Sequence, residues 1–96
     1  MARRIVERFH PEKIILFGSH ARGQAGADSD VDLLVVMPYQ GTRFRMQAEI
    51  RLVLRDFPVA KDIVVTTPEA FAWRREIPGT IERPAFIEGR VLHERG

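Results

Sequence analysis

Two apolar runs separated by a polar, glycine-bearing loop constrain this chain most strongly. The runs are Ile14–Phe17 and Val31–Met37, both short and rich in isoleucine, leucine and valine, which is typical of buried strands. Asp30 and Asp32 stand at the start of the second run. Because side chains two positions apart in a strand share one face, about 6.5 Å apart along the chain, the two carboxylates are expected to point the same way.

A close pair of carboxylates is unfavourable unless something neutralises it. Two carboxylates about 5 Å apart repel by roughly 3 kcal/mol at an effective dielectric constant near 20. Either one carboxylate binds a proton or a cation lies between them. Mg²⁺ is the natural cation, since it prefers oxygen ligands and is commonly held by one or two carboxylates together with substrate phosphates. The pair therefore predicts a metal site at the start of this strand.

The other half of the predicted site is Gly18-Ser19, directly after the first apolar run. Glycine lets the backbone approach a ligand closely, and a serine near free N–H groups can hold a phosphate. Arg22 lies three residues beyond Ser19, within reach of the same anion; the alternative is a surface arginine that braces the loop. A second alternative is that Asp28 or Asp30 merely ends a loop built from turn-forming residues.

The spacing of these residues resembles a known signature. Gly18-Ser19, ten residues, then Asp30-Val31-Asp32 is similar to the motif of the DNA polymerase β-like nucleotidyltransferase superfamily. The longer strings FGSHARG, from Phe17, and SDVDL, from Ser29, resemble the minimal nucleotidyltransferases, typically encoded beside a HEPN-domain protein as a toxin–antitoxin pair. The resemblance implies a nucleotidyltransferase that moves AMP from ATP to a protein hydroxyl, with two Mg²⁺ ions. The acceptor would be a tyrosine of the HEPN toxin, which makes this chain the antitoxin.

The resemblance also implies roles for individual residues. Three acids would bind the metal ions and carry the catalysis: Asp30, Asp32 and Asp62. Asp62 stands at the start of a later apolar run, where the superfamily places its third carboxylate, and it would also help to deprotonate the acceptor; alternatively, Lys61 pairs with it on the surface. Three loop residues would hold the ATP phosphates: Gly18, Ser19 and Arg22.

Periodicity and capping signals predict eight elements. The expected helices are Ala2–Phe9, a helix capped by Thr42 and ending near Asp56, one capped by Thr67 and ending near Glu76, and a short last one closed by Gly89 at C′. The expected strands are Lys13–Phe17, Asp30–Met37, Val59–Thr66 and Arg90–His93, the last at an edge. This order indicates one α/β (α+β) domain over residues 1–96: a mixed sheet of three to four strands with helices on one face, the nucleotidyltransferase palm.

The second expected helix has two distinct sides. One side is an apolar stripe expected to be buried: Met46, Ile50, Val53, Leu54 and Phe57. Gln47, Arg51 and Arg55 lie on the other side, which we interpret as a solvated face. The alternative is a contact with a partner or with nucleic acid.

Composition narrows the possible partners. The net charge is only +2, from thirteen arginines and two lysines against thirteen acids, and the arginines are scattered along the sequence without interleaved aromatic residues. Nucleic acid is therefore not expected as the main ligand. No apolar run approaches about 18 residues, and the basic start lacks an apolar stretch after it, so we expect no membrane span, no signal peptide and a cytoplasmic location.

Two other functions stay open at this point. One is a non-catalytic binding module that neutralises its partner by forming a complex, with the acidic site idle. A nucleic-acid end-modifying transferase would need a basic track leading into the site. Since no second domain for acceptor recognition is evident, we expect the chain to use a partner or self-association, as a homo- or hetero-oligomer.

Overall fold

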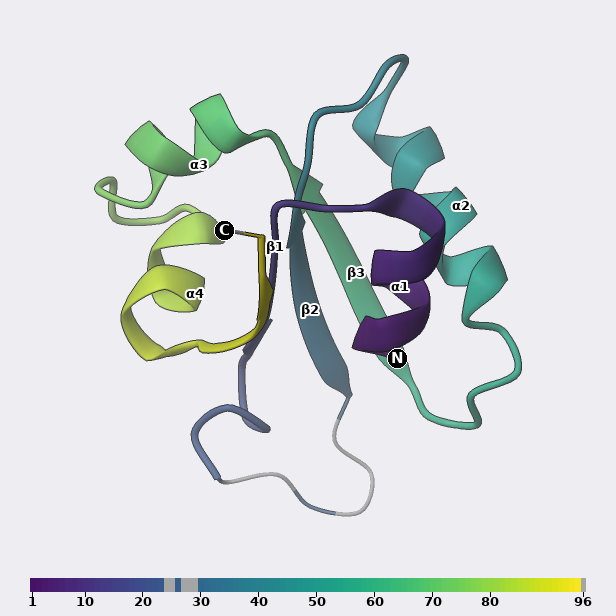
Figure 1. The fold of residues 1–96 in the computed structure, drawn as a ribbon. Helices are drawn as coiled ribbons and strands as arrows, with labels where there is room; N and C mark the ends of the chain where they lie inside the picture. The colour runs from purple at the N-terminus through teal and green to yellow at the C-terminus, as the bar shows by residue number, and fades with distance from the viewer. Residues whose placement is uncertain (24–25, 27–29, 96) are drawn as a thin grey trace.

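The computed structural model describes residues 1–23, 26 and 30–95. The helices and strands in this part follow one another along the chain as α1 (Ala2–Phe9), β1 (Lys13–Phe17), β2 (Val31–Val36), α2 (Arg43–Val53), β3 (Lys61–Thr66), α3 (Pro68–Arg74), α4 (Glu82–Glu88) and β4 (Arg90–Glu94). Figure 1 shows them arranged around one sheet. The predicted elements are confirmed in type and order, with ends that differ by up to three residues.

The strands form one mixed sheet in the order β3-β2-β1-β4. β1 pairs antiparallel with both β2 and β4, whereas β2 and β3 run parallel. A parallel pair needs a crossover connection, and α2 supplies it between β2 and β3. β4 lies at an edge of the sheet, as predicted.

Helices cover both faces of the sheet, which corrects the prediction that they lie on one face. Successive strand residues point to opposite faces, so each strand contributes to two cores. The larger core packs against α1 and α2 and contains Ile5, Ile14, Leu33, Val35, Met37, Ile50, Leu54, Ile63 and Val65. The smaller core packs against α3 and α4 and contains Ile15, Leu34, Val36, Phe71 and Ala85. Figure 1 shows the two helix pairs on opposite sides of the sheet.

Two helix starts follow the predicted capping chemistry. The hydroxyl oxygen of Thr42 accepts a hydrogen bond from the backbone N–H of Arg45, at 3.1 Å. The hydroxyl oxygen of Thr67 accepts one from Ala70, also at 3.1 Å, and Pro68 stands at the first helical position. Both predicted caps are confirmed.

Gly89 ends α4 for a different reason from the one predicted. Its φ of −73° is open to any residue, so it is not a left-handed C′ glycine. A Cβ atom there would lie 2.1 Å from the carbonyl oxygen of Ala85 and 2.4 Å from Cγ2 of Ile15. The residue is glycine because α4 and β1 approach each other closely at this point.

In the described part of the chain, every helix is too short or too polar to cross a membrane.

Candidate active site

Two aspartates lie side by side where β2 and β3 begin. Asp32 is the second residue of β2, and the parallel register places it directly opposite Asp62, the second residue of β3. On its other side, the antiparallel register places Phe17, the last residue of β1. The strand that carries Asp62 is therefore a direct neighbour of the strand that carries Asp32.

Both aspartates emerge on the face of the sheet that packs against α3 and α4. Asp32 alternates in step with Leu34 and Val36, which are buried in the smaller core. The end of β1 and the start of β2 lie at one end of the sheet, and α3 lies at the other (Figure 1). Asp32, at the first of these ends, is half-buried, while Asp62 is exposed. The two carboxylates are thus held by a rigid sheet but remain accessible to solvent.

Gly18 brings the backbone of the first loop against the carboxylate of Asp32. Its φ of +76° is in the left-handed region, which favours glycine. A Cβ atom at this position would lie 2.3 Å from Oδ2 of Asp32, closer than any side chain tolerates. The backbone then turns once, and the N–H of Arg22 donates to the carbonyl of Gly18 at 3.3 Å. Glycine at position 18 therefore leaves room for the Asp32 carboxylate to lie against the backbone of this loop.

The surroundings of Asp32 favour its protonated form. Burial raises the pKa of the Asp32 carboxyl first, and the negative charges of Asp62 and Asp30 raise it further. His20 and Arg22 act in the opposite direction. The repulsion expected between the acids is therefore present, with Asp62 contributing more than Asp30.

Asp62 has a cationic neighbour that the sequence interpretation assigned to solvent. Nη2 of Arg51, in the last turn of α2, lies 3.9 Å from Oδ1 of Asp62. Lys61, the predicted surface partner, instead donates from its ammonium group to the carbonyls of Phe57 and Val59. The sequence places Arg51 near the end of the helix that precedes the Asp62 strand, but this indicates a contact only once the helix is known to be a crossover between parallel strands.

The remaining predicted residues lie around this centre. Asp30 is exposed and directly precedes β2, and Ser19 lies in the turn after β1. Nη1 of Arg22 is 3.5 Å from Oε2 of Glu88, an ion pair in which both side chains are nearly half exposed. Asp28, which was an alternative residue for ending the loop, and the turn-forming Ser29 lie outside the described residues.

Comparison with known proteins identifies the family. A family model described as a nucleotidyltransferase domain matches residues 1–88. The chain belongs to the nucleotidyltransferase domain family. A protein of Methanocaldococcus jannaschii named "Putative protein adenylyltransferase" is 34% identical over 82 residues, which cover 85% of this nucleotidyltransferase and 78% of the relative.

Two solved structures have the same fold. A toxin–antitoxin crystal structure with AMP-PNP is 17% identical with a TM-score of 0.61, covering 98% of this chain and 70% of its own. The toxin–antitoxin MntA-HpeT, in a form with two aspartates two positions apart changed to glutamate, is 14% identical with a TM-score of 0.57 and the same coverage. At these identities the likeness shows the fold of the nucleotidyltransferase, which is the predicted fold.

The donors in this nucleotidyltransferase suit a hard divalent cation. Asp32 and Asp62 offer carboxylate oxygens side by side, and their repulsion helps to raise the pKa of Asp32. Within residues 1–23, 26 and 30–95, no three acidic or histidine side chains are grouped so as to hold a metal ion by themselves. The carboxylates fit a cation that takes further ligands from substrate phosphates, the arrangement that Mg²⁺ commonly adopts.

Proposed function

We propose that this nucleotidyltransferase is a Mg²⁺-dependent antitoxin that transfers AMP from ATP to a hydroxyl group of a partner protein. The observation that carries the proposal is the position of Asp32, which lies against the backbone of Gly18 and directly beside Asp62. A phosphate chain bound along the Gly18 turn would meet the carboxylates there. The name of the archaeal relative and the two toxin–antitoxin structures support the same activity.

The proposed reaction is a direct displacement at the α-phosphorus of ATP. The acceptor oxygen forms a bond to that phosphorus, the bond to the oxygen that bridges to the β-phosphate breaks, and pyrophosphate leaves with the bonding electrons. Asp62, exposed at the start of β3, accepts the proton of the acceptor hydroxyl. Asp30 and Asp32 would hold one Mg²⁺ ion and Asp62 a second, and these ions would supply positive charge at the attacking and leaving oxygens.

The Gly18 turn would position the triphosphate for this displacement. Backbone N–H groups at Gly18 and Ser19, together with the Ser19 hydroxyl, would hold the β- and γ-phosphates. Arg22, in the same turn, would bring its positive charge to the phosphates by giving up its exposed ion pair with Glu88. The acceptor that we propose is a tyrosine of a HEPN-domain toxin encoded beside this chain.

A melting experiment tests the ligand site, and a mass-spectrometric assay tests the transfer. Mg²⁺ together with ATP should raise the melting temperature, because a ligand that binds the native state stabilises it, and ATP in EDTA should do much less. Incubation with the protein encoded by the neighbouring gene should add the mass of AMP to one tyrosine. Equal stabilisation with and without metal, or an unmodified partner, would contradict the proposal.

A second candidate function is neutralisation of the partner by binding alone. It is favoured by the cation already near Asp62, Arg51, and by the lack of a preassembled metal-binding group among the described residues. Asp30→Asn separates the two functions. Loss of both AMP transfer and neutralisation, with unchanged affinity for the partner, supports the enzyme; retained neutralisation supports the binding module.

A further inference from the structure

Helix α2 carries a second apolar stripe on the side that points away from the core. Its inner side is fully buried at Ile50. Its outer side presents Phe44, Ala48 and Leu52 at positions i, i+4 and i+8, which align on one face of a helix. Phe44 is 77% exposed and Leu52 is 57% exposed. A helix that is apolar on both sides has an outer side without a partner in the described chain.

Arginines that are scattered in the sequence are concentrated on the two helices that cover one face of the sheet, α1 and α2. Seven of the thirteen arginines lie in α1, α2 and residues 55–56. The same segments contain only three acids, Glu7, Glu49 and Asp56. This is an excess of four positive charges on a chain whose net charge is +2. Since α1 and α2 pack on the same face of the sheet, the excess lies on one side of the molecule (Figure 1).

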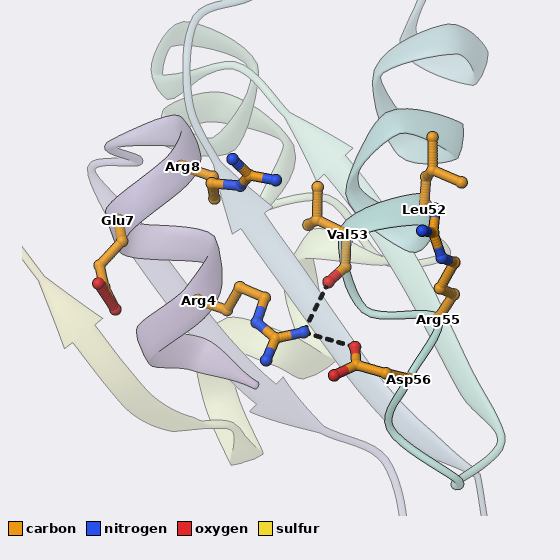
Figure 2. Close-up of a pocket in the computed structure, with 7 residues that line it drawn as sticks. All are labelled: Arg4, Glu7, Arg8, Leu52, Val53, Arg55 and Asp56. Carbon is orange, nitrogen blue, oxygen red and sulfur yellow. Dashed lines mark hydrogen bonds and ion pairs between the residues drawn. The ribbon is translucent and has the colours of Figure 1, made fainter.

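A pocket of about 520 Å³ lies between α1 and the C-terminal end of α2. Figure 2 shows Arg4 reaching across it to the carbonyl of Val53 and to the carboxylate of Asp56. Leu52 and Arg55 line its α2 side, and Arg8 lines its α1 side. The pocket therefore adjoins the outer apolar stripe at Leu52.

Several of these arginines have no hydrogen-bonded or ion-paired partner in the described chain. In the part of the chain that the structure describes, the guanidinium groups of Arg8, Arg43, Arg45 and Arg55 make no hydrogen bond or ion pair. Arg4, in contrast, is neutralised by Asp56. We call this region the α2 surface, and it consists of the Phe44–Ala48–Leu52 stripe, these four arginines and the pocket. It combines exposed apolar side chains with unpaired positive charge.

We propose that the α2 surface is the docking site for an amphipathic helix of a protein partner that carries acidic side chains beside its apolar stripe. Apolar residues at i, i+4 and i+8 match the spacing by which one helix packs along another. Exposed aromatic and arginine side chains around an apolar centre are enriched in protein interfaces. Flanking carboxylates on the partner complement the unpaired arginines and increase the association rate. The inference goes beyond the proposed transfer and does not depend on it.

Charge and the shortage of aromatic rings argue against two other occupants. A second copy of this chain would bring the arginines of one α2 surface against those of the other, which is repulsive. Nucleic acid would find one ring for base stacking on the α2 surface, Phe44, because Ala48 and Leu52 carry none. A helix with its own apolar stripe instead packs against all three residues and brings its carboxylates to the arginines.

A displayed library of 18-residue peptides, selected for binding to the full chain, tests the proposal. Peptides that also bind the double variant Leu52→Glu/Arg55→Glu are discarded during the selection. We expect the surviving peptides to be enriched in aspartate and glutamate beside apolar residues spaced at i and i+4. A purified representative, followed by fluorescence anisotropy, should bind the double variant at least about 20-fold more weakly than wild type. Its affinity should also fall between 50 and 300 mM salt.

The matched control is Ile87→Glu/Arg90→Glu, because Ile87 is 58% exposed, like Leu52 at 57%, and Arg90 is also exposed. It should bind the peptide as wild type does. Circular dichroism confirms folding, and Arg55→Glu alone replaces the double variant if that variant melts early. Three results would overturn the proposal. The first two are selected peptides without acidic enrichment and an equal loss of peptide affinity in the control variant. The third is a 20-nucleotide oligouridine that binds more tightly than the peptide and loses its binding in the double variant.

Discussion

Two carboxylate sites lie at opposite ends of the same face of the sheet, and the fold treats them in opposite ways. At one end, Glu82 is only 2% exposed and accepts hydrogen bonds from the Thr66 hydroxyl at 2.8 Å and from Nε of Arg74 at 3.0 Å. Burial alone would raise the pKa of Glu82, but the bonds from Arg74 and Thr66 hold that pKa below its usual value. At the other end, burial and neighbouring acids raise the pKa of Asp32.

We interpret the difference as that between a structural carboxylate, Glu82, and the proposed ligand-binding carboxylate, Asp32. Asp62 and Thr66 lie four residues apart on the same face of β3. The same strand therefore forms part of both carboxylate sites, and its backbone does not account for the difference between them. Glu82 has a cation and a hydroxyl that satisfy its charge, and it joins α3 and α4 to β3. Asp32 faces other carboxylates instead, an arrangement that stabilises nothing by itself and that suits a ligand supplied from outside.

The largest expected effect is on catalysis at Asp32. Asp32→Asn should lower AMP transfer by about 10³-fold or more, because the charge stabilisation of the transition state is lost. In EDTA the same change should leave the free energy of unfolding equal or about 1 kcal/mol higher, since it removes a repulsion. Transfer is measured by mass spectrometry and stability by urea unfolding. Retained transfer together with a clear loss of stability would show that Asp32 is structural.

Glu82→Gln should give the reverse result. Removing the charge weakens the bonds from Arg74 and Thr66 in a buried setting, which should lower the free energy of unfolding by about 2 kcal/mol. The folded variant should keep its transfer rate within about twofold. Glu88→Gln, on the same helix, is the control: its ion pair with Arg22 is exposed, so its effect should stay within about 0.5 kcal/mol. Similar losses in both variants would remove the distinction between the two ends of the sheet.

A pair of glycine substitutions separates backbone strain from the space that Asp32 needs. Gly18 and Gly79 both have positive φ, of +76° and +94°, so alanine at either position should cost about 1 kcal/mol. Only at Gly18 would the new Cβ meet a side chain, the Asp32 carboxylate, which can rotate away. We therefore expect similar unfolding free energies, but loss of the Mg²⁺–ATP melting shift in Gly18→Ala alone. A wild-type shift in that variant would mean that the turn is not part of the site.

The sequence predicted most of the elements because those signals are local, whereas the catalytic role of the three acids stays a prediction, with Asp32 and Asp62 found side by side. Apolar runs, the threonines before α2 and α3, and the Asp30–Asp32 spacing can each be recognised within a few residues. The side of the sheet on which a helix packs depends on how distant elements cross over, so the prediction of one covered face was wrong. Gly89 shows part of the same limit, since a Cβ atom there would meet Ile15, which is distant in the sequence, as well as the nearby carbonyl of Ala85.

The arginines of α2 illustrate a related limit. Arg51 was assigned to a solvated face because its helix position points away from the buried stripe. Only the parallel pairing of β2 and β3 brings the start of β3, and with it Asp62, close to the last turn of α2. Similarly, Phe44 and Leu52 form a second stripe that a search for one buried face overlooks. The role of each of these residues depends on which side of α2 packs against the core, and that side is set by the arrangement of distant elements.

The smallest expected effect is the pH dependence of stability, in which the two carboxylates should act with opposite signs. The native pKa of Asp32 is raised above 3.8, so the native state binds this proton more tightly and wild-type stability falls as the pH rises through that pKa. The native pKa of Glu82 is lowered below 4.5, so its stabilisation is present above pH 4.5 and is lost as the pH falls through the native pKa.

Urea unfolding in EDTA from pH 3 to 7 should therefore show diverging curves. Relative to wild type, Asp32→Asn should gain about 0.5–1 kcal/mol between low and neutral pH, a modest amount because this carboxylate is only half-buried. Glu82→Gln should lose stability relative to wild type over the same range, since only the wild type gains the charged, hydrogen-bonded carboxylate. Curves that slope the same way would mean that both carboxylates are satisfied by the fold, and the case for Asp32 as a ligand-binding group would fail.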